Sequence, residues 1–147
     1  MVMTRRQLLR SLDAVQIEKA IEKAEQLTSG EIRVTVAPLF WGSVDKAAEK
    51  AFGMLGMTKT EQRNGVLFFV VPSRRKFVVL GDKGIHEKVG QEFWNEVVAG
   101  MRTLFQKGDF TSGLVKGILQ VGEQLAAHFP YDATTDRNEL PNSVNFE

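Results

Sequence analysis

The first amphipathic segment of the chain repeats its apolar residues at a helical period. Intervals of three and four residues place these positions on one face of an α-helix. They are Ile17, Ala20, Ile21, Ala24 and Leu27. Ser11 is a suitable N-cap, Asp13 lies in the first turn and Gly30 ends the segment. The charged residues between the apolar ones, Glu25 among them, form the predicted solvent-exposed face.

Three further segments predict β-strands. Residues 31–37 alternate apolar with polar or small side chains, which predicts a strand with one buried face. Residues 65–71 are almost continuously apolar up to Pro72, which is typical of a strand buried on both faces. Residues 76–80 return after a connection of three residues, so short that the pair must form an antiparallel hairpin.

Helical patterns occupy most of the remaining chain. Ser43 caps a helix that runs to about Gly56, and a long helix follows Gly84 as far as about Gln106. Asp109 is the expected N-cap of a last helix, which Pro130 ends. About four helices and three strands predict an α/β protein, a three-layer α/β/α sandwich around a small mixed sheet with a β-hairpin.

The predicted domain spans residues 12–129. Residues 1–11 form an N-terminal extension. Residues 130–147 form a polar tail in which Leu140, Val144 and Phe146 could dock on the domain.

Composition narrows the functional classes. The net charge of +1 gives no basic face for nucleic acid, and the absence of cysteine excludes disulfides and thiolate chemistry. No apolar run is long enough for a secretory signal or a membrane span. We therefore expect a soluble, cytoplasmic protein without membrane insertion.

The predicted topology brings distant polar residues to one edge of the sheet. A helix joins the first two strands, so these run parallel with a right-handed crossover, and the third strand runs opposite to them. Glu31, Asn64 and Asp82 then share an edge, with the two carboxylates on the order of 5–12 Å apart.

Two carboxylates at this range repel each other unless a cation, a proton or a basic side chain lies between them. Arg63 is one basic candidate, and calcium or magnesium would prefer such oxygen ligands. The metal ligands predicted are Glu31 and Asp82. Further polar candidates at this site are Asn64, Lys83, His86, Glu87 and Glu92.

The opposite edge gathers Phe40, Trp41 and Arg74, more apolar and with a basic tip. If exposed, these residues would form an interaction surface, and the expected partner is another protein.

Catalytic motifs are incomplete. The Gly81–Gly84 loop has the Gly-x-x-Gly spacing of KH domains but follows a strand instead of joining helices. His86-Glu87 begins like a zinc-protease motif, yet position 90 is glycine where a second histidine is needed. No serine or cysteine lies in a nucleophile elbow, so the residues define no catalytic constellation.

With these residues placed, the chain resembles the TPM domain family. The resemblance rests on residues 28–34, 64–67, 79–84 and 105–110 together with Gly113-Leu114. It implies an α/β/α sandwich, and the chain is similar to the short soluble bacterial variants. Calcium binding and acid phosphatase activity, attributed to some members, would by this resemblance fall on Glu31 and Asp82.

Three functional hypotheses follow. The first is a soluble binding or accessory module with an acidic divalent-cation site, calcium above all, at one sheet edge. The second is a weak metal-assisted acid phosphatase, in which Lys83 neutralises phosphate charge beside Glu31 and Asp82. The third is a ligand-free protein-interaction or assembly domain.

Overall fold

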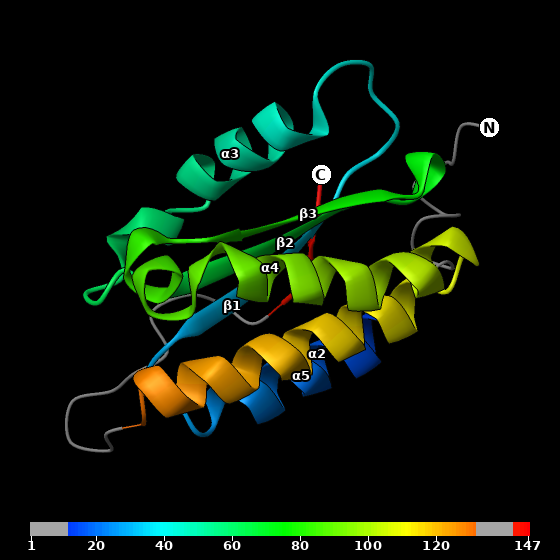
Figure 1. Cartoon of the computed structure of the whole chain (residues 1–147). Coiled ribbons are helices and arrows are strands. Elements are labelled where there is room, and N and C mark those ends of the chain that lie inside the picture. Colours follow the sequence, from blue (N-terminus) through cyan, green and yellow to red (C-terminus); the bar gives the residue numbers. More distant parts are fainter. Residues whose placement is uncertain (1–11, 132–142) are drawn as a thin grey trace.

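The computed structural model describes residues 12–131 and 143–147, which form four α-helices and one four-stranded sheet (Figure 1). The helices are α2 (Ala14–Glu25), α3 (Val44–Met54), α4 (Lys83–Gln106) and α5 (Phe110–His128). The strands are β1 (Glu31–Val36), β2 (Gly65–Val71), β3 (Lys76–Gly81) and β4 (Asn145–Phe146).

The sheet has the order β3-β2-β1-β4 and the predicted mixture of directions. β1 runs parallel to β2, with Glu31 opposite Gly65, and β2 runs antiparallel to β3, with Val66 opposite Gly81. β4 pairs in parallel with the end of β1. The predicted parallel crossover and hairpin are therefore confirmed, and the last residues of the chain add a strand that was not expected.

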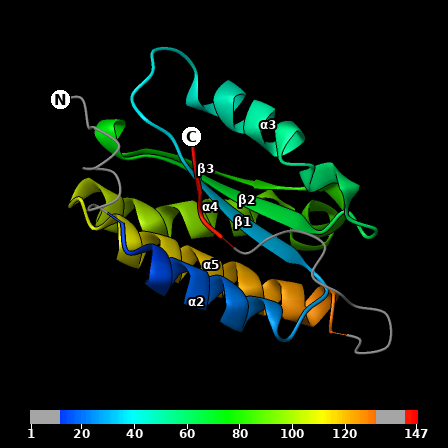
Figure 2. The same cartoon turned by 180° about the vertical axis from the view of Figure 1, so that it is seen from behind.

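The helices cover the two faces of the sheet unequally. Helices α2, α4 and α5 lie on one face and α3 lies alone on the other (Figures 1 and 2). Alternate residues of β2 therefore enter different cores: Phe68 packs with the three helices, whereas Phe69 packs on the α3 side. The three-layer α/β/α sandwich is confirmed, and β2 is buried on both faces as its continuous apolar pattern predicts.

Side-chain caps fix where the helices begin. Ser43 and Asp109 cap α3 and α5 as expected, by accepting hydrogen bonds from the amides of Lys46 and Ser112. Asp13, which the pattern places inside the first turn, is the N-cap of α2. Ser11, the cap expected from the sequence, lies outside the described residues.

The end of α2 differs from the prediction. The helix ends at Glu25, so Leu27 leaves the apolar face and is 68% exposed. Thr28 and Gly30, which follow, are buried where the chain turns into β1.

Strand β1 is buried on both faces, which corrects the expectation of one solvent-facing side. The physical reason is that helices lie on both faces of the sheet and that β1 is an interior strand, between β2 and β4 (Figures 1 and 2). Its alternating polar residues are consequently enclosed, and Glu31 is only 2% exposed.

Helix α4 contains a break that its sequence pattern did not reveal. Gly90 has φ 75° and ψ 170°, outside the helical region, so two helical segments meet at this residue. A positive φ of this kind suits glycine, which has no Cβ to clash. The predicted helix over this range is therefore present, but it is kinked at Gly90.

In the tail, Val144 is buried and Phe146 belongs to β4, so both dock as predicted. Leu140 lies outside the described residues.

Candidate functional site at the acidic edge of the sheet

Glu31 and Asp82 lie at the same edge of the sheet, on either side of β2. Glu31 is opposite Gly65, and the backbone amide of Asp82 donates a hydrogen bond of 2.9 Å to the carbonyl of the same glycine. Two strand spacings separate the two backbones, which corresponds to about 10 Å. The convergence inferred from chain direction is thus present, with one strand between the two acidic residues.

Asp82 is neutralised by an arginine from the preceding loop. Arg63 Nε donates to Oδ2 at 2.5 Å, and Arg63 Nη2 donates to Oδ1 at 2.8 Å. The Asp82 carboxylate also caps α4 by accepting from the Lys83 amide. The hydrogen bond to Asp82 raises the pKa of the Arg63 guanidinium above its ordinary value. Of the three alternatives for balancing the Asp82 charge (a cation, a proton or a basic side chain), the structure contains the basic side chain, Arg63.

The loop that carries Arg63 is packed tightly against the start of α4. The Arg63 carbonyl accepts from the amides of Gly84 and Ile85, and the Arg63 backbone has a positive φ of 53°. A β-carbon at Gly84 would lie 2.1 Å from the carbonyl oxygen of Gln62. Glycine is therefore required there, and the first amides of α4 are already used within the protein.

A second cluster of charges surrounds Glu31. Glu25, in the last turn of α2, accepts a hydrogen bond of 2.8 Å from the Ile32 amide. Burial raises the pKa of Glu25 to about 8, and the nearby Glu31 carboxyl contributes through its charge and a hydrogen bond. Near neutral pH, the Glu25 carboxyl group therefore carries a proton.

Arg33, 5% exposed, completes this cluster. Burial lowers the pKa of its guanidinium, while the charges of Glu25 and Glu31 oppose that shift. Sequence reasoning missed the roles of Glu25 and Arg33. Glu25 was assigned to the solvated face of α2, and the only signal for another role was its position in the last turn, six residues before the β1 strand.

Asn64 directly follows Arg63, is buried, and forms hydrogen bonds with neighbouring loops. Its Nδ2 donates to Ser29 Oγ at 3.3 Å, and its amide donates to Thr60 Oγ1. These bonds connect the end of the α2–β1 turn to the loop before β2.

The other predicted polar residues lie on α4. The side chains of Lys83, His86, Glu87 and Glu92 are exposed, and in the described part of the chain none forms an ion pair or side-chain hydrogen bond with Asp82. His86 Nδ1 instead accepts a hydrogen bond of 3.0 Å from Trp94 Nε1.

A preformed metal centre would gather several ligating side chains. Within residues 12–131 and 143–147, no group of three or more His, Cys, Asp or Glu side chains is placed to hold a metal ion. Glu31 and Asp82 as ligands therefore remain a prediction, and a cation would compete with Arg63 for Asp82.

At the opposite edge, the three predicted surface residues lie together. Trp41 is 88% exposed. Phe40 packs edge-on against Phe69, with ring centroids 6.4 Å apart. The Arg74 guanidinium lies 5.5 Å above the Phe40 ring and donates to the carbonyls of Phe40 and Gly42.

The fold and the edge geometry define a small α/β/α domain with buried, internally compensated charges at one end of its sheet. A family model for the TPM domain matches residues 2–124. The chain belongs to the TPM domain family.

Solved structures agree with this assignment. The NMR structure of the BA42 protein from the psychrophilic bacterium Bizionia argentinensis is 38% identical, with a TM-score of 0.84 over 92% of this chain and 95% of that one. The N-terminal domain of a protein from P. gingivalis is 17% identical, with a TM-score of 0.65 over 82% of each chain.

A third structure, the N-terminal domain of the cg2496 protein from Corynebacterium glutamicum, is 16% identical, with a TM-score of 0.57 over 76% of this chain and 70% of that one. At such identities the last two show the shared fold alone. A comparison with curated proteins finds no match. None of the helices in the described residues is long and apolar enough to cross a membrane.

Proposed function

We propose that this TPM domain is a non-catalytic binding module that takes up a divalent cation at its acidic edge. The observation that carries the proposal is the charge balance there. Three carboxyl groups (Glu25, Glu31 and Asp82) accompany two guanidinium groups (Arg33 and Arg63). The raised pKa of Glu25 means that this carboxyl carries a proton near neutral pH. A cation can take the place of such a proton, because carboxylate oxygens are the ligands that calcium and magnesium prefer.

The ligands in this proposal are Glu31, as predicted from the sequence, and Glu25. Asp82 joins them only if the cation displaces Arg63, whose side chain is 35% exposed and can leave. Metal binding to protonated ligands releases protons. Binding near pH 7 should therefore release about one proton, and affinity should increase as the pH rises toward the pKa of Glu25.

The test is a calcium titration followed by amide NMR shifts in a weakly buffered solution, with magnesium as a second metal. We expect saturable shifts around Glu31, released protons, and stronger binding by Arg63→Gln, which frees Asp82. Glu25→Gln should bind more weakly and release no proton. The absence of shifts at Glu31, Asp82 and their neighbours at millimolar metal would refute the proposal.

A metal-assisted phosphatase uses the same residues but is less well supported. It needs Asp82 as a ligand or base, and both Asp82 oxygens already accept charged or backbone hydrogen bonds. A carboxylate held in this way is a poor base, because proton transfer to it must break the ion pair with Arg63. We therefore place binding before catalysis.

Trp41 supports contact with another protein. An exposed tryptophan next to Phe40 and the Arg74 guanidinium supplies the aromatic and arginine groups that are enriched in protein interfaces. We assign this surface to a partner protein, as the sequence predicts.

A further inference from the structure

Strand β3 leaves one side of the sheet unpaired. Among residues 12–131 and 143–147 its only sheet neighbour is β2, because β3 stands first in the strand order. The amide of Asp82 bonds to Gly65, and in an antiparallel pair such inward-bonded residues alternate with outward-facing ones. Phe77, Val79 and Gly81 therefore direct their backbone N–H and C=O groups away from β2.

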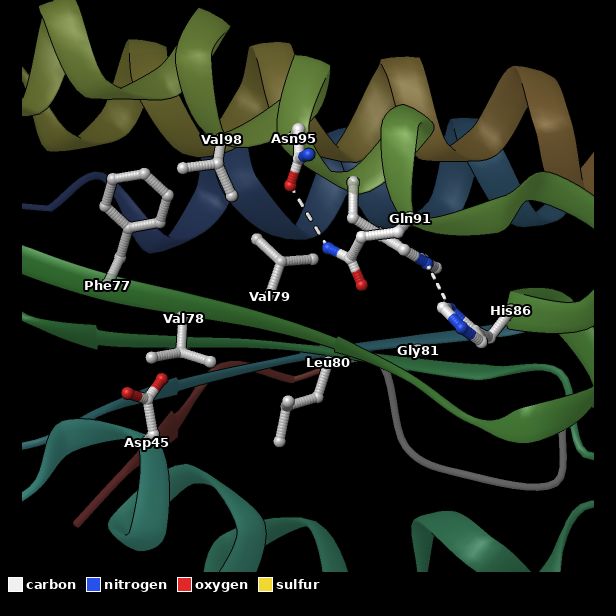
Figure 3. A pocket seen from close by; sticks show the side chains of 11 residues that line it. Asp45, Phe77, Val78, Val79, Leu80, Gly81, His86, Gln91, Asn95 and Val98 are labelled. Carbon is white, nitrogen blue, oxygen red and sulfur yellow. Dashed lines mark hydrogen bonds between the residues drawn. The ribbon is translucent and has the colours of Figure 1, made fainter.

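These outward groups lie in a groove between two helices. Two adjoining hollows of about 390 Å³ and 400 Å³ run along β3 and share Asp45, Phe77 and Val78. Figure 3 shows Asp45 on the α3 side of β3, with Gln91, Asn95 and Val98 of α4 on the other side. The groove thus has a strand edge as its floor and a helix along each wall.

Besides the open edge of β3, the groove has polar side chains that could bind the backbone of a peptide. Gln91 Nε2 donates to Asn95 Oδ1 at 3.1 Å, and both side chains are exposed at the wall (Figure 3). Carboxamides of this kind carry both donors and acceptors, which match peptide groups. The apolar side chains of β3 line the space between them.

One end of the groove is strongly basic. Four cations line the second hollow and only one carboxylate, Asp45, does so. The cations are Arg74, Arg75, Lys76 and Arg102. None of these four side chains forms an ion pair with a described residue; the ion pair in the described part of the chain is Arg63–Asp82, at the other edge of the sheet. The four cations at this end therefore outnumber its single carboxylate.

We propose that the free edge of β3 binds an extended peptide segment of a partner protein, with acidic residues at the end that meets these cations. Peptides add to open sheet edges in this way in several domain families: backbone hydrogen bonds supply affinity and side-chain pockets supply specificity. β3 has six residues, which gives an edge of about 20 Å for the added strand. The inference concerns a different surface from the acidic edge and does not depend on cation binding.

A second copy of this chain is a poorer occupant of the groove. Its β3 strand, Lys76–Gly81, contains no acidic residue and begins with a lysine, so it would not compensate the basic end. The helical walls also admit a single strand more easily than the edge of another domain, which carries its own flanking helices. Charge and shape thus both favour a separate acidic peptide.

The experiment uses synthetic peptides of alternating threonine and valine with two aspartates at the N-terminal or the C-terminal end. Counterparts with two lysines serve as controls. We expect at least one acidic peptide to shift the amides of β3 and to slow hydrogen exchange at Phe77, Val79 and Gly81. The lysine counterparts should bind about tenfold more weakly or not at all.

Val79→Pro provides a backbone test, because proline removes the outward N–H and is tolerated on edge strands. Val79→Thr keeps that N–H and is the matched control. We expect about a tenfold loss of affinity for Val79→Pro and little change for Val79→Thr. Lys76→Glu combined with Arg102→Glu should weaken the acidic peptide and strengthen the lysine one, a reversal that loss of folding cannot produce.

Several results would overturn the proposal. They are no binding of either acidic peptide at millimolar concentration, equal binding of the lysine counterparts, and exchange protection that falls outside β3. Sedimentation showing that the parent chain self-associates through β3 would assign the groove to a second copy and equally overturn it.

Discussion

The Arg63 guanidinium donates two hydrogen bonds, of 2.5 Å and 2.8 Å, to the carboxylate of Asp82, nineteen residues further along the chain. The pair joins the loop before β2 to the first turn of α4. Asp82 is only 6% exposed. The net stabilisation by such a buried ion pair is small, because both charges are desolvated, but removing one partner leaves a buried unpaired charge and is strongly destabilising.

We expect Arg63→Gln to lower the free energy of unfolding more than Asp82→Asn. The first change leaves a buried carboxylate without its counter-charge, whereas asparagine removes the charge and still caps a helix. Urea unfolding of both variants and of the double variant measures the coupling. Strictly additive effects would show that the pair contributes nothing beyond its separate residues.

Stability should fall as pH rises from about 4.5 to about 8, the ordinary and folded pKa values of Glu25. Within this window the folded state binds more protons than the unfolded state, so deprotonation favours unfolding. The slope attributable to this one group is at most about 1.4 kcal/mol per pH unit.

Urea unfolding at several pH values, compared between the parent and Glu25→Gln, isolates that contribution. The variant cannot titrate at this position, and its stability should depend less on pH across the window. Identical pH profiles would mean that Glu25 titrates in its ordinary range.

Gly84→Ala should destabilise the protein by about 1–3 kcal/mol, the usual cost of overpacking. The added β-carbon would fall 2.1 Å from Gln62 O and 2.6 Å from Arg63 O, and both are backbone atoms that cannot swing aside. Gly53→Ala is the matched control, because a β-carbon there meets nothing within 4 Å. In helix α3 that change should be stabilising, by about 0.5–1 kcal/mol. Thermal unfolding of the two variants compares them directly, and equal effects would contradict the tight loop–helix contact.

Comparing Phe40→Ala with Trp41→Ala should distinguish a residue that stabilises the fold from one that is available for binding. Phe40 is partly buried against Phe69 and under Arg74, so its truncation should destabilise the fold by about 1–3 kcal/mol, less than a fully buried aromatic. Trp41→Ala should change stability by no more than about 0.5 kcal/mol, because the side chain is almost entirely in solvent.

Light scattering of the parent and of Trp41→Ala then reports on association. A reduced tendency of the variant to assemble, at unchanged stability, would agree with a contact surface at Trp41. A large loss of stability would instead give this residue a structural role.

Most of the architecture could be predicted because each strand has its own pattern of apolar residues and its own type of connection to the next. The unbroken apolar run of β2 and the short turn before β3 fix two neighbours and their directions, and a helix between β1 and β2 fixes the third. Chain direction alone therefore placed Glu31 and Asp82 at one edge of the sheet.

The partners of those acids could not be predicted in the same way. Arg63 was one of several basic candidates, and its contact with Asp82 depends on how the loop before β2 packs on the start of α4. Glu25 follows the polar pattern of an exposed helix face, yet it reaches the Ile32 amide because α2 ends at this residue and the chain turns back into β1. Gly90 likewise gives no periodic signal, since a single residue can break a helix without disturbing the apolar spacing on either side.

The pairing of β4 with β1 has a consequence for how the chain folds during synthesis. β1 is among the first elements to leave the ribosome, but the amide of Glu147 bonds to Val36, and Asn145 pairs with Thr35. Such contacts join segments about 110 residues apart, so they form only after β4 has been made, and topologies rich in them fold slowly. In a nascent chain the β4 side of β1 therefore stays unpaired until residues 145–147 have been made, and an open strand edge of this kind is a template for pairing with other chains.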